Sequence, residues 1–197
     1  MRRVVLSKPD MIQFERHESD YYFVGLRHDD IQEIRKWRNA QQDVLRQQRP
    51  ITREGQEQWW ENVVVPMRMR SNPEFLLVSI LDIGRKLIGY GGLTYIDWHD
   101  RQAEISFLVS PVRAVDPILY EKDLLAFWRF LQNWAFKELG LQRLVTETYD
   151  FRHAHIALLE KAGMTLEGRT RNSVKVDNGY ADSLLHELTA TDKNKRA

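Results

Sequence analysis

The alternation of hydrophobic and polar positions predicts strands in seven stretches of the chain. They are residues 21–27, 75–81, 86–96, 102–109, 144–149, 164–174 and 182–189. These stretches are rich in β-branched and aromatic residues. The three central ones are expected to form an antiparallel meander, because short polar loops join them. The last two flank Asp177-Asn178-Gly179, which is typical of a tight hairpin turn.

Hydrophobic residues at helical spacing predict four helices between these strands. The positions that define them are Ile31, Ile34 and Trp37; Trp59, Trp60, Val63 and Val64; Leu124, Phe127, Leu131 and Trp134; and Ile156, Leu159 and Ala162. Asp29 or Asp30 is expected to cap the first helix, and Thr52 the second. Pro66 is expected to end the second helix and Gly163 the fourth.

The order and number of these elements indicate one compact α+β domain. A chain of 197 residues with 43% hydrophobic content can bury one core but is short for two ordinary domains. Residues 1–20 have weak periodicity and many charges, so they are expected to form a weakly structured N-terminal arm. The domain is then expected to span 21–190, followed by a frayed tail at 191–197.

Composition narrows the possible functions. The 29 Lys and Arg residues nearly balance the 28 Asp and Glu residues, so no overall field favours nucleic acid or an anionic membrane as a partner. The chain has no cysteine, which excludes a disulfide framework and a cysteine nucleophile. No metal site is expected, since His153 and His155 are two apart and do not share a helix face. Without a signal peptide or an apolar span, a cytoplasmic location is expected.

Two segments carry a family resemblance. Residues 26–39, LRHDDIQEIRKWRN, and residues 158–183, LLEKAGMTLEGRTRNSVKVDNGYADS, occur in an element order that resembles the GNAT superfamily of N-acetyltransferases. The branch that they resemble contains ribosomal-protein N-terminal acetyltransferases and nucleotide-amino-sugar N-acetyltransferases. The resemblance implies a three-layer α+β fold, with a mostly antiparallel, splayed seven-stranded sheet flanked by about four helices.

The resemblance also implies an activity. It indicates acetyl-CoA as co-substrate, without a metal, and direct attack of a primary amine on the thioester. The Trp-Arg-Asn at 37–39 and the Pro-Ile-Thr at 50–52 resemble the amino-sugar enzymes more closely, so a nucleotide-linked amino sugar is the expected acceptor. Two alternatives remain: a protein N-terminal acetyltransferase, and an inactive GNAT-fold binding protein. A monomer or a homodimer is expected, with a small-molecule amine as the partner.

Two residues are candidates for proton transfer. Glu104 is the candidate general base, because it shares a strand face with Ser106 and Leu108, and desolvation there would raise its pKa. The alternative is a solvated sheet face or an ion pair with Arg101 or Arg143. Tyr149, at the end of its strand, is the candidate acid or an ordinary strand-end aromatic. Many relatives place a tyrosine on the next helix, where this chain has Leu159.

The expected cofactor site departs from the family pattern. The resemblance places backbone contacts to the pantetheine arm at Phe107, Leu108, Val109 and Ser110. The glycine positions of the family's pyrophosphate loop fall at Tyr120 and Lys122, where bulky residues block a close backbone approach or reshape the loop. Charge could come from Arg113 and Lys122, and Asp123 could cap the helix. Arg152 stands where relatives keep an asparagine that contacts the cofactor.

A substrate groove is expected near the first two helices. Arg38, Asn39 and Trp59 are the candidate substrate-binding residues, and Arg38 suits a phosphate or carboxylate. The alternative for Trp59 is the core, and for Arg38 a solvated position. Residues 89–92, Gly-Tyr-Gly-Gly, lie inside a strand, so they indicate a bulge or close packing rather than a phosphate loop.

Overall fold

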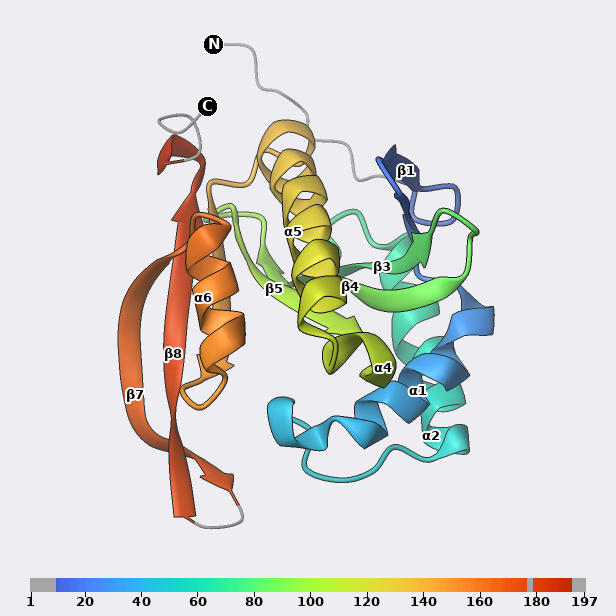
Figure 1. The fold of residues 1–197 in the computed structure, drawn as a ribbon. Coiled ribbons are helices and arrows are strands. Elements are labelled where there is room, and N and C mark those ends of the chain that lie inside the picture. The colour runs from blue at the N-terminus through green and yellow to red at the C-terminus, as the bar shows by residue number, and fades with distance from the viewer. Residues whose placement is uncertain (1–9, 177–178, 193–197) are drawn as a thin grey trace.

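The computed structural model describes residues 10–176 and 179–192, and within them it contains one eight-stranded sheet in the order β1-β2-β3-β4-β5-β6-β8-β7 (Figure 1). The strands are β1 Glu15–Glu18, β2 Tyr21–Gly25, β3 Leu76–Asp82, β4 Leu87–Asp97, β5 Gln102–Val109, β6 Arg143–Tyr149, β7 Thr165–Val176 and β8 Gly179–Thr189. All neighbouring pairs are antiparallel except β5 and β6. The predicted mostly antiparallel sheet is confirmed. Asp177 and Asn178 of the expected hairpin turn lie outside the described residues.

The expected count of seven strands is wrong by one, because residues 15–18 form β1 and pair with β2. These residues lie in the segment expected to be a weakly structured arm. Just before them, Met11 and Phe14 are buried in the main core, and the Phe14 ring lies 4.7 Å from that of Trp134. Two buried apolar side chains within a charged segment were too few to give a periodic signal.

Six α-helices occur in the described residues, where about four were expected. They are α1 Ile31–Ala40, α2 Arg53–Trp59, α3 Val65–Met69, α4 Pro111–Ala114, α5 Pro117–Asn133 and α6 His153–Lys161. Thr52 caps α2 by accepting from the Gly55 amide at 3.0 Å, as predicted. Pro66 does not end the second helix, because a π-helical turn at Trp60–Val64 joins α2 to α3, and Pro66 lies in the first turn of α3. None of the helices in the described ranges is long and apolar enough to cross a membrane.

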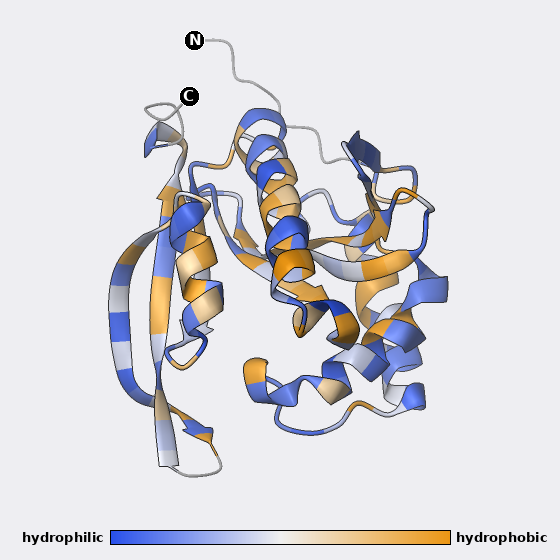
Figure 2. Ribbon diagram, viewed as in Figure 1, coloured by the Kyte–Doolittle hydropathy of each residue, from blue (hydrophilic) through white to orange (hydrophobic). Residues whose placement is uncertain are grey.

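Helices cover both faces of the sheet and bury two apolar clusters. On one face α5 and α6 contribute to the main cluster, in which Phe127 and Phe130 of α5 pack against Phe23 of β2. On the other face α1 and the π-helical turn pack over Leu77, Tyr90 and Leu108. Figure 2 shows that hydrophobic residues gather in α5 and the central strands, whereas β7 is mostly hydrophilic. The predicted three-layer arrangement is confirmed.

Glycines in β4 permit close packing, as residues 89–92 indicated. A Cβ at Gly91 would come 2.3 Å from the Ser106 carbonyl oxygen and 2.9 Å from the Phe127 ring. Gly92 has a φ of +142° and lies against the backbone of Leu76. These contacts bring β4 close to β3, β5 and α5 beside the candidate site.

Candidate active site

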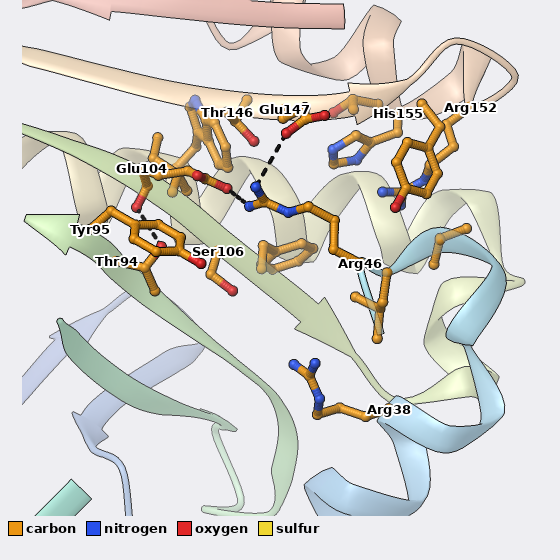
Figure 3. Close-up of a pocket in the computed structure, with 17 residues that line it drawn as sticks. Arg38, Arg46, Thr94, Tyr95, Glu104, Ser106, Thr146, Glu147, Arg152 and His155 are labelled. Atoms are coloured by element: carbon orange, nitrogen blue, oxygen red, sulfur yellow. Dashed lines mark hydrogen bonds and ion pairs between the residues drawn. The ribbon is translucent and has the colours of Figure 1, made fainter. Parts of the chain in front are cut away.

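The sheet opens between β5 and β6. Their parallel pairing covers only Gln102 to Glu104 on β5 and Arg143 to Val145 on β6, after which the strands diverge. A cavity of about 320 Å³ lies at this opening (Figure 3). Residues of β4, β5, β6, α5 and α6 and of the loop after α1 line it. The three-residue pairing thus produces the splayed sheet that the sequence predicted.

Glu104 lies where the pairing ends and faces this cavity. Its side chain is 18% exposed. Burial raises the pKa of Glu104 from its ordinary value, and the Glu147 carboxylate raises that pKa further, while Arg46 opposes both effects. A half-buried carboxylate with a raised pKa is suited to accept a proton near neutral pH.

Arg46 is the ion-pair partner of Glu104, in place of the expected Arg101 or Arg143. Its guanidinium contacts the Glu104 carboxylate and also reaches Glu147 on β6 at 3.2 Å (Figure 3). Arg143 is paired with Glu187 at 2.8 Å and with Glu167 at 2.5 Å. Arg46 comes from the loop between α1 and α2, so no periodic pattern connects it to β5. It places one cation between two carboxylates at the opening of the sheet.

Tyr149, the candidate acid, also lines the cavity. Burial raises the pKa of its phenol, so the hydroxyl stays protonated at neutral pH. Leu159, at the position where relatives keep a tyrosine, is fully buried in the main core. Tyr149 therefore remains the candidate acid, since it brings a phenol to this cavity and Leu159 does not.

A second cavity, of about 550 Å³, adjoins the first on the side of α1 and α2. The two share the lining residues Arg38, Thr94, Tyr95 and Ser106. Much of the remaining wall is aromatic, and Glu74 supplies an acid. Because Ser106 is two residues from Glu104 on the same strand face, the candidate base lies beside the junction of the cavities.

The three expected substrate-binding residues have different positions. Arg38 lines both cavities and donates hydrogen bonds to the Tyr90 hydroxyl and to Gln47. Trp59 lines the second cavity. Asn39 instead bonds both backbone groups of Ile51, at 2.9 Å and 2.8 Å, so it holds the loop that carries Arg46. Arg38 and Trp59 remain candidates for substrate contact, and the contacts of Asn39 indicate a structural role.

The start of α5 differs from the expected phosphate loop. Asp116, not Asp123, caps this helix by accepting from the Ile118 and Leu119 amides, each at 3.0 Å. The helix begins three residues before Tyr120, so both glycine positions lie inside it. The amides that would form an anion cradle are therefore already bonded within the protein.

Three of the expected cofactor-binding side chains lie away from the cavity. Asp123 is fully buried; it accepts from Tyr21 at 2.8 Å and from Arg113 at 2.5 Å and 2.7 Å. Lys122 pairs with Asp20 at 2.7 Å. Arg113 and Lys122, which were expected to supply charge to a phosphate, are each paired with an acid of the chain, and Asp123, the expected cap, is the partner of Arg113.

The expected backbone contacts on β5 are partly occupied. The Ser110 amide donates to Ile88 at 2.9 Å, and the Val109 carbonyl accepts from Gln41 at 2.9 Å. Phe107 lines the first cavity, whereas the side chain of Leu108 belongs to the cluster under α1. Among the four, Phe107 is the one at the cavity wall.

Arg152 lies at the cavity, and it is accompanied by Tyr120 and His155, which the sequence did not predict as site residues. Arg152 precedes the first turn of α6 and donates to the Tyr120 hydroxyl at 3.1 Å. The same hydroxyl lies 2.8 Å from Nδ1 of His155. Burial, reinforced by the positive charge of Arg152, lowers the pKa of His155 to about 3, so its ring is neutral.

The cavity wall also contains polar atoms without a protein partner. Within the described residues, the indole N–H of Trp128 and the hydroxyl of Thr148 are buried and accept or donate no hydrogen bond. Both residues line the first cavity. Such groups are compatible with a polar ligand, because an unpaired buried donor is unfavourable. Over the same ranges, His, Asp and Glu side chains form no group of three that could bind a metal.

Comparison with solved structures supports the same fold. Spermidine N-acetyltransferase from Vibrio cholerae in complex with CoA and spermine matches with a TM-score of 0.77 and 16% identity, over 89% of this chain and 98% of that one. A dodecameric form of that enzyme matches with a TM-score of 0.75 and 15% identity, over 91% of this chain and 99% of that one. A structure described as a probable acetyltransferase matches with a TM-score of 0.70 and 19% identity, over 91% of this chain and 98% of that one.

Comparison with sequences identifies the family. No curated protein matches the chain. The model of the GNAT acetyltransferase domain matches residues 24–185, which is most of the chain. The chain therefore belongs to the GNAT acetyltransferase family, and it is an N-acetyltransferase whose acyl donor is acetyl-CoA.

Proposed function

We propose that this enzyme acetylates a primary amine of a polycationic, polyamine-like acceptor, with Glu104 as the general base. The observation that carries the proposal is the pair of carboxylates, Glu104 and Glu147, that holds a cation at the opening of the sheet. The solved neighbours named above include an enzyme that acts on spermidine, which supports the same acceptor class. The nucleotide-linked amino sugar expected from the sequence lacks such support, and its phosphates would meet two acids here.

The second cavity suits an aliphatic chain that carries positive charge. Trp59, Phe75, Tyr90 and Tyr95 contribute aromatic surface, over which methylene groups can pack and an ammonium can lie. Glu74 adds a carboxylate to the same wall. An acceptor with several amines could therefore bind along this cavity while one amine reaches Glu104 at the junction.

The cavity fits the arm of the donor, whereas the start of α5 does not fit its phosphates. Acetyl-CoA, when bound, supplies an acetyl group activated as a thioester. The opening beside Phe107 and the unpartnered groups of Trp128 and Thr148 provide a lined channel with polar contacts. The amides at the start of α5 are capped by Asp116 and do not provide an anion site.

Glu104 and Tyr149 divide the proton transfers in this proposal. An acceptor ammonium must lose a proton before its nitrogen can attack, and Glu104 accepts that proton directly or through water. The released amine forms the new C–N bond as the C–S bond of the thioester breaks. Tyr149, which is protonated at neutral pH, donates a proton to the leaving thiolate. The acylated nitrogen then releases its second proton, which passes through water to the Tyr149 phenolate, so the products are the amide, the free thiol of CoA and one proton on Glu104.

The test is the substitution Glu104→Gln, assayed by CoA release with spermidine and acetyl-CoA. We expect kcat to fall by about 10²- to 10⁴-fold, the range for loss of a general base, with little change in the affinity for acetyl-CoA. Glu138→Gln is the matched control, because Glu138 is an exposed acid paired with Arg16 outside both cavities.

Three outcomes would contradict parts of the proposal. An unchanged kcat in Glu104→Gln would reject this residue as the base. Acetylation of peptide N-termini without turnover of polyamines would favour the protein N-terminal alternative. A wild-type protein that binds acetyl-CoA but acetylates neither class of amine would favour the non-catalytic alternative.

We also propose an oligomeric state. The dodecamer of the spermidine enzyme suggests an oligomer larger than the monomer or homodimer expected from the sequence. Light scattering of the purified protein measures this directly.

A further inference from the structure

We propose that Arg152, Tyr120 and His155 form an anion-binding unit that holds a phosphate group of acetyl-CoA in place of the amide groups at the start of a helix. The proposal concerns the acyl donor, so it does not depend on which amine is the acceptor. Three observations support it: the usual anion site is closed, a cation at the cavity lacks an acidic partner, and a buried ring presents a second donor.

The start of α5 offers no room for an anion. The Asp116 carboxylate accepts from two of its amides, and the Tyr120 amide donates to the Asp116 carbonyl at 2.9 Å. The negative charge of Asp116 also opposes a phosphate at this position. The neighbouring cations do not compensate, because Arg113 is bonded to the buried Asp123 and Lys122 to Asp20.

Arg152 carries a positive charge at the cavity that no carboxylate neutralises. Among the described residues, its side chain donates to the neutral hydroxyl of Tyr120 and forms no ion pair with a carboxylate. The acids of the same cavity, Glu104 and Glu147, are paired with Arg46. Arg152 also precedes the first turn of α6, where the helix dipole favours an anion.

His155 lies beside Arg152, as Figure 3 shows, and brings a second ring nitrogen to the cavity. The residue is 9% exposed and lines the cavity. Arg152 donates to the Tyr120 oxygen, which lies 2.8 Å from Nδ1 of the neutral His155 ring, and we assign the Tyr120 hydroxyl as the donor to Nδ1. The proton of the ring is then on Nε2, for which the described residues provide no recorded acceptor.

Two residues at which this chain departs from the family pattern contact each other in this unit. Tyr120 stands at a glycine position of the usual phosphate loop, and Arg152 stands at the position of the usual asparagine. In the fold their side chains are bonded to each other at 3.1 Å. The unit presents a guanidinium and an imidazole N–H to the cavity and no acceptor, which is the donor set that a phosphate requires.

The experiment is calorimetric titration of the full-length protein with acetyl-CoA and, separately, with acetylpantetheine, which has no phosphate. No acceptor amine is present, so the result is independent of turnover. We expect Arg152→Gln to weaken binding of acetyl-CoA by about 10- to 100-fold, the range for loss of a charged hydrogen bond, and to change binding of acetylpantetheine by less than about twofold.

Further variants separate this role from a structural one. Tyr120→Phe is expected to weaken acetyl-CoA binding less than Arg152→Gln, because it removes only the hydroxyl that orients the other two side chains. Arg152→Lys is expected to restore part of the lost affinity. Arg129→Gln, an exposed cation on α5, is the matched control and is expected to leave both affinities unchanged.

Two results would overturn the proposal. One is an equal loss of affinity for acetyl-CoA and acetylpantetheine in Arg152→Gln, which would indicate a general disturbance of the cavity. The other is a variant that binds acetyl-CoA as tightly as the wild type. Thermal melts of each variant check that the fold is retained.

Discussion

At the residue scale, Arg46 controls the charge environment of Glu104. Its guanidinium stabilises the ionised carboxylate, whereas burial and Glu147 favour the protonated form. Removing Arg46 leaves only the two effects that raise the pKa of Glu104. Because a general base must be ionised, activity falls as the pH drops through this pKa.

We therefore expect Arg46→Ala to move the acidic limb of the kcat/KM profile to higher pH. Above that limb, KM for a polyamine is expected to fall, because the acceptor no longer displaces a resident cation. Arg46→Lys is the control, since it keeps the charge. The acidic limb of its kcat/KM profile is expected at nearly the same pH as in the wild type. An unchanged limb in Arg46→Ala would show that Arg46 does not set the pKa of the base.

The chemistry of single residues was only partly predictable from the sequence. Glu104 stood out because an acid in the middle of a strand is uncommon. Its contact with Arg46 joins residues 58 positions apart, and the contact of Tyr120 with His155 joins residues 35 apart. No local spacing encodes such contacts, since they depend on how the loop after α1 and the helices α5 and α6 pack against the sheet.

At the scale of elements, strand boundaries followed the stretches rich in β-branched and aromatic residues, but the start of α5 did not follow the family pattern. The family pattern placed the loop glycines at Tyr120 and Lys122, with Asp123 as the expected cap, whereas Pro117 starts the helix and Asp116 caps it. The apolar face of α5 was predicted well because its apolar residues recur at helical spacing. Its first turn carries no apolar repeat, so only the cap residue and the proline mark it.

We expect Asp116→Ala to lower the free energy of unfolding by about 1 kcal/mol, because two amides of α5 lose their acceptor. Asp116→Asn is the matched variant. It keeps the acceptor oxygen and removes the charge, so its stability is expected within about 0.5 kcal/mol of the wild type. Urea denaturation measures both values. Equal stability of Asp116→Ala and the wild type would show that solvent satisfies these amides as well as Asp116 does.

At the scale of the whole molecule, Met11 and Phe14, which precede β1, belong to the core. Phe14 is 5% exposed and contacts the rings of Phe130 and Trp134. We expect Phe14→Ala to lower the free energy of unfolding by about 3–5 kcal/mol, as for other buried aromatic side chains.

Ile12→Ala is the control for that measurement, because Ile12 is 71% exposed and its loss is expected to change stability by about 0.5 kcal/mol or less. A similarly small effect of Phe14→Ala would instead support the weakly held arm expected from the sequence. Chemical denaturation followed by tryptophan fluorescence is a suitable measurement, since Trp134 lies beside Phe14.

The α+β class, the layers and the splayed sheet could be predicted at this scale, because the order of elements resembles that of the GNAT superfamily. The cavities could not be predicted, since their walls combine side chains from six or more separate segments. The closed phosphate loop was visible in the sequence as missing glycines. The contacts that Tyr120 makes there could be seen only in the packed fold, in which α5 brings Tyr120 against the start of α6.

The bridge that Arg46 makes has a consequence for how the proposed acceptor binds. With one guanidinium already between Glu104 and Glu147, the arrival of an ammonium is an exchange of counterions, and the net charge of the site stays the same. Selectivity then depends on how much better the ammonium of the acceptor fits between the two carboxylates than the Arg46 guanidinium does. A small monovalent amine gains little from such an exchange, whereas a long acceptor gains additional contacts along the aromatic cavity that Arg46 cannot reach.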